Sequence, residues 1–355
     1  MFYVISMRPC GNGLDSVLLA LDSKHPEAPG RVLGNCSNLP VSSSSKVRAA
    51  FAADGTVTLF VSANTLHVRY TSRMANGRII RTRHVDADSS ADIYMLAPNS
   101  KAPPIRVFSV DLFPGRSGSA SQHIEDFRYA PKTKHFYVHI GVRNPRGSQY
   151  SRMVEAECKV MSDRRARSVV RDIGLLEPLP PQIGGMALSM DGRFLWYFAC
   201  RDGRIYGGKK NAEVVQFDMT SRVEVKAMPL PALGATEAWY VDHLDVDPYS
   251  GDIFFCCVGG HNVIPQLWWM RSPNLMPRSS ITMALLARQD TGSGLTISQM
   301  RDDNPTRVFV SADDGIFSFG TNAHWKINNS VNLRFQLEDR DPHMVQYGSA
   351  VVITP

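Results

Sequence analysis

The 355-residue sequence has no long apolar run and no extended helical period. No hydrophobic stretch reaches the roughly 18 residues that a membrane-spanning helix needs, so we expect no membrane span. No pattern of helical period competes with the short strand-like segments along the chain. The first residues, Met1–Met7, lack a basic region followed by an apolar segment, so we expect a strand there and not a signal peptide.

The cysteines also lack an informative pattern. The chain has six, and none is spaced as a metal-ligand pair or as part of a disulfide framework. Cys256 and Cys257 are adjacent, and on a strand their side chains would point to opposite faces. We therefore expect reduced, mostly buried thiols in a soluble cytoplasmic protein.

Positive charge exceeds negative charge, with a formal net charge of +6 and a pI near 9.0. Arginine is concentrated in two segments, Arg69–Arg83 and Arg164–Arg171, which could form an anion-binding surface. The alternative is that both segments are solvated hairpin insertions. Since no aromatic-interleaved RNA motif or Cys/His finger accompanies them, the sequence does not favour nucleic acid as the partner. The candidate anion or partner surface consists of Arg69, Arg73, Arg78, Arg81 and Arg83.

The chain repeats one pattern at a period of about 50 residues. An apolar strand is followed by a turn rich in Asp, Gly or Pro, and then by a strand rich in aromatic and β-branched residues. The clearest copies begin at Met186 and Leu244, and weaker copies begin near Ala49, Phe127 and Ile297. A sixth copy forms only when the chain ends are joined, since 350–355 has the first-strand pattern and 2–5 the second-strand pattern.

These repeats predict an all-β fold, a six-bladed β-propeller, with residues 1–355 as a single domain. Pairing the N- and C-terminal strands in one blade would close the ring and remove its exposed strand edges. We expect an arginine-rich insertion at about 71–90, as a loop or extra hairpin on a rim. The stretch from Val57 to Val110 is long enough for a seventh blade. The expected third strands lie at 17–21, 93–96, 153–156, 214–217, 267–270 and 316–319.

In a six-bladed propeller the first strands surround a central channel, so polar groups at their starts can converge. The two most polar starts are His123–Asp126 and Asp242–His243. Glu125 and Asp242 could supply oxygen ligands to a hard cation such as Ca²⁺, or raise one another's pKa for acid–base work. The alternative is that they bond neighbouring backbone while the histidines line a wet channel.

Residues 180–275 resemble the paraoxonase, gluconolactonase and strictosidine-synthase-like propellers, most closely over Val241–Phe254. The resemblance implies a catalytic calcium bound by an Asp-Asn pair at the positions of Asp242 and His243. The upstream segment Ile183–Gly192 resembles that family's Asn-Gly-Ile segment. His261 lies near the position of a family active-site histidine.

This sequence departs from the family at its ligands, because the ligand asparagines fall on Gly184 and His243. A calcium site would thereby lose two oxygen donors. A remodelled site could place a softer divalent metal in the channel or use histidines as acids and bases. The candidate metal ligands are Glu125, Asp242 and His243, and the candidate catalytic set is His123, Glu125, Asp242, His243 and His261.

The departures favour a propeller that acts as a binding or scaffold module, related to the lactonase-like enzymes. Its partner would be a protein or a small molecule at a propeller face, with Trp239–Tyr240 and Trp268–Trp269 as further candidate contacts. The alternative is a small-molecule hydrolase, lactonase- or arylesterase-like, or an isomerase with a remodelled channel site.

Overall fold

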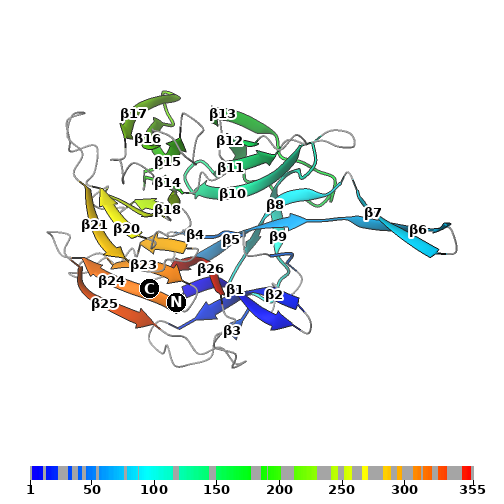
Figure 1. The fold of residues 1–355 in the computed structure, drawn as a ribbon. Coiled ribbons are helices and arrows are strands. Elements are labelled where there is room, and N and C mark those ends of the chain that lie inside the picture. Colours follow the sequence, from blue (N-terminus) through cyan, green and yellow to red (C-terminus); the bar gives the residue numbers. More distant parts are fainter. Residues whose placement is uncertain are drawn as a thin grey trace.

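The regular secondary structure of the residues that the computed structural model describes is all β-strand (Figure 1). None of these residues forms a helix long and apolar enough to cross a membrane. The described residues are 2–10, 13–22, 31–33, 39–41, 45–52, 56–75, 78–86, 88–114, 120–143, 149–176, 185–189, 191–200, 212–229, 241–246, 252–257, 266–270, 283–288, 294–297, 307–312, 315–321, 327–333 and 346–352.

The described strands form six four-stranded antiparallel sheets and one two-stranded hairpin. The sheet that joins the chain ends has the order β26 (Gln346–Val352), β1 (Phe2–Cys10), β2 (Gly13–Leu21), β3 (Arg31–Val32). The next has the order β4 (Val47–Phe51), β5 (Val57–Thr65), β8 (Ser90–Leu96), β9 (Ile105–Asp111). The third has the order β10 (Ser121–Ala130), β11 (His135–Arg143), β12 (Gln149–Glu157), β13 (Val170–Leu176).

The remaining three sheets each use four consecutive strands. The fourth consists of β14 (Met186–Leu188), β15 (Phe194–Cys200), β16 (Ala212–Asp218) and β17 (Val223–Pro229). The fifth consists of β18 (Val241–Val246), β19 (Ile253–Cys257), β20 (Gln266–Met270) and β21 (Met283–Arg288). The sixth consists of β22 (Gly294–Ile297), β23 (Arg307–Ala312), β24 (Gly315–Thr321) and β25 (Ile327–Leu333).

The first strands of the six sheets form a closed ring. Strand β4 contacts β10, β10 contacts β14, β14 contacts β18, β18 contacts β22, β22 contacts β26, and β26 contacts β4. Six antiparallel sheets arranged around a ring of their first strands define a six-bladed β-propeller. Each of the six predicted third strands lies in the third strand of its sheet, so the repeat pattern is confirmed.

The two chain ends share one blade, as predicted. Strand β26 pairs antiparallel with β1, with Phe2 opposite Val352 and Tyr3 opposite Val351. Strand β1 therefore has β26 on one side and β2 on the other, and neither of its edges is left open.

The predicted insertion is an extra hairpin, formed by β6 (Val68–Ala75) and β7 (Arg78–Val85). It projects from the body of the propeller (Figure 1), and we call it the arm. The hairpin begins slightly before the predicted start at Thr71. Because β5 and β8 pair directly across its root, the described residues of this segment form one blade and an arm, with no seventh blade. That the whole chain is one domain stays a prediction.

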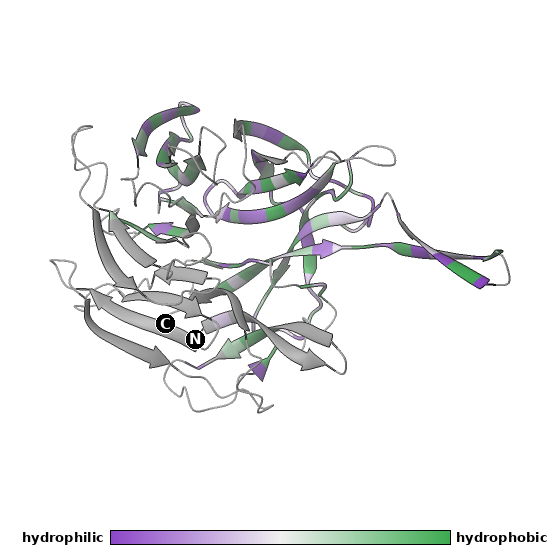
Figure 2. Cartoon of the chain, in the orientation of Figure 1, coloured by the Kyte–Doolittle hydropathy of each residue, from purple (hydrophilic) through white to green (hydrophobic). Residues whose placement is uncertain are grey.

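Packing between the β4–β9 blade and the β10–β13 blade relies on aromatic side chains. Phe60, Phe108, Phe127 and Phe136 are all buried. The ring of Phe136 lies 5.2 Å from that of Phe60 and 6.1 Å from that of Phe127, in edge-to-face arrangements. Apolar and polar residues alternate along many of these strands (Figure 2), and the apolar ones fill the wedge between the sheets.

Cys158 is the cysteine whose side chain the structure describes, and it is a free thiol. Burial raises its pKa to about 11, so it stays protonated at neutral pH. The predicted reduced state of the other five cysteines stays a prediction. The cytoplasmic location stays a prediction.

Candidate functional site

Two first strands carry a β-bulge at the residue predicted to face the channel. In β10, Ile124 and Asp126 pair with consecutive residues of β11, which leaves Glu125 as the extra residue. In β18, Val241 and His243 pair with consecutive residues of β19, which leaves Asp242 as the extra residue. A bulge redirects the side chain that it carries. Glu125 and Asp242 thus occupy equivalent backbone positions in two blades.

His123 and Glu125 form a close pair on β10. The Nε2 atom of His123 lies 2.6 Å from Oε1 of Glu125, and both side chains are partly exposed. The hydrogen bond to Glu125 raises the pKa of His123 above its ordinary value, against an opposing effect of burial. The pair occupies the space beside Gly141 of β11, where a Cβ atom would lie 2.7 Å from the Glu125 carboxylate. Gly141 thus makes room for the pair.

His139 of β11 is fully buried and interacts electrostatically with both residues of this pair. Burial lowers its pKa, although the nearby carboxylates of Glu125 and Asp126 act in the opposite direction. Its Nε2 atom has no hydrogen-bond partner among the described residues. Burial therefore favours the neutral imidazole at His139.

Asp126 is the buried carboxylate of the ring of first strands. It forms ion pairs with Arg48 from β4 and, at 3.3 Å, with Arg128 from β10. Both guanidinium groups are largely buried with it. A buried carboxylate needs such partners because its desolvation is costly. Sequence reasoning missed both arginines.

The same group of side chains bonds the main chain of two further blades. Asp126 accepts hydrogen bonds from the backbone N–H of Phe127 at 2.7 Å and of Met186, in β14, at 3.0 Å. Arg128 donates to the backbone carbonyl of Leu244, in β18, at 3.0 Å. These contacts, with the two ion pairs, form what we call the Asp126 network. It connects the first strands of four blades.

Of the residues named for the metal site, the structure describes the side chain of Glu125 alone. The neighbouring Asp126 does not suit a cation, because both of its oxygens accept hydrogen bonds and two guanidinium groups beside it would repel a positive charge. No group of three His, Cys, Asp or Glu side chains in the described part of the chain could hold a metal ion. The structure describes Asp242 and His243 only as backbone of β18, and Gly184 and His261 lie outside the described residues. The metal assignment to Glu125, Asp242 and His243 stays a prediction.

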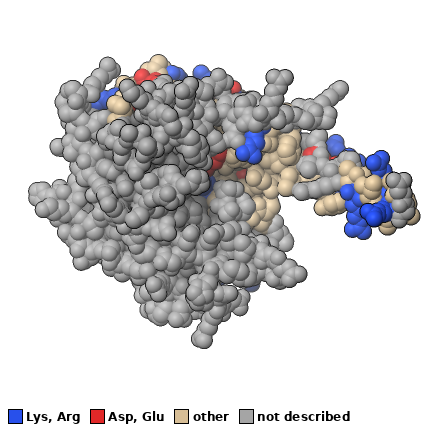
Figure 3. Space-filling model, viewed as in Figure 1, with Lys and Arg blue, Asp and Glu red and all other residues tan. Residues whose placement is uncertain are grey.

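The arm presents most of the predicted arginine surface. Arg69, Arg73, Arg78 and Arg81 are exposed, whereas the structure describes Arg83 only as backbone of β7. Figure 3 shows basic side chains gathered on the outer part of the arm. Large apolar side chains are exposed alongside them, with exposed fractions of 67% for Tyr70, 73% for Met74 and 67% for Ile79.

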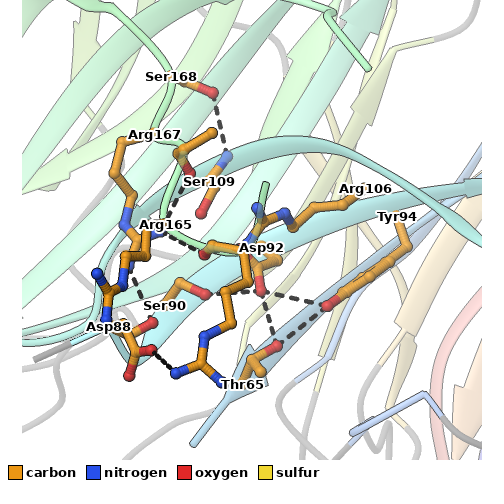
Figure 4. Close-up of polar contacts among 12 residues, drawn as sticks. Thr65, Asp88, Ser90, Asp92, Tyr94, Arg106, Ser109, Arg165, Arg167 and Ser168 are labelled. Carbon is orange, nitrogen blue, oxygen red and sulfur yellow. Dashed lines mark hydrogen bonds and ion pairs between the residues drawn. The ribbon is translucent and has the colours of Figure 1, made fainter. Parts of the chain in front are cut away.

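A buried polar cluster fixes the root of the arm. Thr65, the last residue of β5, donates to Asp92 Oδ2 at 2.7 Å, and Ser90, the first residue of β8, donates to the same atom at 2.9 Å. The Tyr94 hydroxyl also contacts this carboxylate (Figure 4). Arg106 lies 3.8 Å from the other oxygen of Asp92. The strands that lead into and out of the arm are therefore tied together.

A charged pocket of about 570 Å³ lies at the base of the arm. The loop before β13 closes one side of it, and Arg164 of this loop pairs with Asp88 at 2.6 Å. Arg167 pairs with Asp111 at 2.6 Å. It also donates to the Asp88 carbonyl, and Figure 4 shows both of these residues. The second arginine-rich segment thus binds the base of the arm. The residues that line the pocket are Arg69, Asp86, Asp88, Asp111, Arg164, Arg165 and Arg167.

Comparisons with known proteins return solved structures only, since no family model and no curated protein matches the chain. A periplasmic gluconolactonase from Pseudomonas aeruginosa is 15% identical over 98% of this chain and 99% of its own, with a TM-score of 0.46. A glucose dehydrogenase is 11% identical over 82% of this chain and 98% of its own, with a TM-score of 0.45. Identities this low carry no information about activity.

The Asp126 network predicts a large loss of stability for Asp126→Asn. The change removes the carboxylate with which the buried guanidinium groups of Arg48 and Arg128 are paired, which costs about 3–5 kcal/mol. Denaturant unfolding measures this loss as a lower midpoint at an unchanged slope. Asp172→Asn is the control, because it removes an ion pair with Arg152 at an Asp that is 57% exposed, and should cost at most about 1 kcal/mol. Equal losses in the two variants would contradict the assignment.

The His123–Glu125 pair predicts a change of pKa in Glu125→Gln. The carboxylate of Glu125 favours the protonated imidazole. Without this carboxylate, the effect of burial, which favours the neutral imidazole, is the larger one. The pKa of His123 should therefore fall from above 6.5 to below 6.5. Titration of the His123 ring proton by NMR, in protein treated with chelator, measures this change. Glu157→Gln serves as the control, and an unchanged pKa in Glu125→Gln would show that the pair does not exist in solution.

Proposed function

We propose that this chain is a β-propeller binding module and that the arm is its binding element. The observation that supports this most strongly is the composition and exposure of the arm. Between Val68 and Val85 it contains five arginines and no Asp or Glu, and its large apolar side chains are exposed. Arginine, aromatic residues and methionine are the types that are enriched at interfaces.

The exposed apolar groups favour a partner that covers them. Tyr70, Met74 and Ile79 each leave about two thirds or more of their surface in water. Single exposed apolar residues are ordinary, but Met74 and Ile79 are direct cross-strand neighbours and form a continuous patch. Burial of such side chains contributes about 25 cal/mol per Å² to association.

The root of the arm supports a pre-organised binding element. A free two-stranded hairpin is marginally stable in water. Here the buried polar cluster around Asp92 joins β5 to β8. Arg69, near the start of β6, pairs at 2.6 Å with Asp86, which directly follows β7. An arm held in this way loses less conformational entropy on binding than a free loop would.

The partner of such an arm is anionic. The arm carries only positive charge and belongs to a chain with a net charge of +6. Exposed positive charges attract an oppositely charged partner and speed its association, and salt weakens this attraction.

The arm predicts specific retention on a polyanion. Heparin immobilised on a column is the probe, and the test variant replaces Arg73, Arg78 and Arg81 with Gln. Because these side chains are exposed, the fold should persist while the variant elutes at clearly lower salt than the wild type.

The matched control replaces Lys101, Lys132 and Lys159 with Gln, since these exposed residues lie on the body and their loss changes the net charge equally. It should elute near the wild type. If both triple variants shift equally, retention reports overall charge, and the arm is not the binding element.

A second candidate function is hydrolysis of an ester or lactone at the His123–Glu125 pair. The observation that favours it is the 2.6 Å contact between these side chains beside Gly141, on a first strand of the propeller. A carboxylate that orients an imidazole is a common arrangement for a general base.

The hydrolase candidate predicts slow turnover of 4-nitrophenyl acetate and of a δ-lactone that depends on this pair. His123→Gln and Glu125→Gln should each lower the rate by about 10²–10⁴-fold. His135→Gln, which changes a histidine on β11, should leave the rate unchanged. Turnover that is absent in the wild type, or equal in all three variants, would exclude the pair as a hydrolytic site.

A further inference from the structure

Guanidinium groups lie on both faces of the arm. Residues that pair across an antiparallel ribbon share a face, and the faces alternate along each strand. Arg81 pairs with Ser72 and so shares a face with Met74, whereas Arg73 and Arg78 lie on the opposite face. A partner with a flat surface would contact one face only and leave the arginines of the other in water. A partner that surrounds the arm contacts them all.

The dimensions of the arm suit the major groove of B-form DNA. Each strand has 8 residues, which at about 3.3 Å per residue give a ribbon about 26 Å long. The major groove is about 12 Å wide, admits a two-stranded ribbon and has phosphates along both walls. The major groove of an A-form RNA duplex is too narrow for side chains to reach the bases.

The side-chain types of the arm also suit a duplex. All its long basic residues are arginine, since Val68–Val85 contains no lysine. Arginine forms paired hydrogen bonds with phosphate and with the O6 and N7 atoms of guanine. Exposed apolar groups such as Met74 and Ile79 can contact thymine methyl groups.

The pocket at the base of the arm contains four arginines and three aspartates, and Arg69, Arg164 and Arg167 are each paired with one of these aspartates. Arg69 belongs to the arm and also lines the pocket at its base, next to Arg164 and Arg165. Arg164 is paired with Asp88, whereas the Arg165 side chain forms no ion pair with any described residue. A phosphate of a duplex that enters along the arm would reach Arg165.

We propose that the arm binds double-stranded DNA in the major groove, with a flanking phosphate at Arg165. This proposal rests on the proposed function, because it names the partner of the same binding element. It replaces the expectation from sequence alone, which did not favour nucleic acid because no known motif was present. The length of the two-stranded arm and the arginines on both of its faces favour DNA instead.

The test is the salt dependence of binding to a short fluorescein-labelled DNA duplex, measured by anisotropy on the full chain. The logarithm of the binding constant should fall with the logarithm of the salt concentration, with a slope of about −0.9 per phosphate contacted. Replacement of Arg73, Arg78 and Arg81 with Gln should make the slope shallower by about 3. Arg165→Gln should make it shallower by about 1.

The lysine triple variant described above is the control, because it has the same net charge as the arginine triple variant. It should keep the wild-type slope, and circular dichroism on every variant checks that the fold is intact. Equal slopes in the two triple variants would overturn the proposal.

Competition separates this proposal from the proposed function. Unlabelled DNA duplex should displace the probe more effectively than single-stranded DNA, an RNA duplex or heparin of equal charge. Equal displacement by all four would overturn DNA recognition but leave an arm that binds anions. If the wild type binds heparin through the arm but no duplex, the partner is another acidic macromolecule, such as an acidic protein, and the DNA proposal is wrong. If no probe depends on the arm, both proposals fail.

Discussion

The buried ion pairs of Asp126 hold the centre of this propeller together. The six sheets are separate hydrogen-bonded units, so side chains must fix each blade relative to the next. Asp126 connects β4, β10 and β14, and through Arg128 the connection extends to β18. The aromatic cluster around Phe136 adds apolar packing between two of the same blades. A charge at this depth is stable only because each of its oxygens has partners.

The charged groups at the centre and on the arm differ in how they are paired. The Asp126 carboxylate is occupied by arginine and backbone N–H groups, so it has no free oxygen for a metal ion or a substrate. The His123–Glu125 pair lies beside it and is a candidate for chemistry of its own. The arm, by contrast, carries cationic and apolar groups that face solvent. The ion pairs that connect the blades lie in the ring of first strands, and the proposed binding surface extends away from it.

Much of the fold could be predicted from the sequence, because each blade repeats a local pattern. The strands beginning at Met186 and Leu244 show it clearly, and the joining of the two chain ends followed from the same pattern. The Asp126 network could not be predicted in this way. Arg48 and Asp126 are 78 residues apart, and nothing near either residue marks the other as its partner. At the candidate site, His123 pairs with Glu125, and Glu125 and Asp242 occupy equivalent bulges, whereas the role of these residues stays a prediction.

Native-state hydrogen exchange tests most directly the division between a fixed centre and a projecting arm. The backbone N–H groups of Phe127 and Met186 donate to Asp126, so they should exchange only through global unfolding. The N–H groups of β6 and β7 should exchange much faster, because the arm can open without the blades. Rapid exchange at Phe127 and Met186, at the rate of the arm, would contradict this account of the centre.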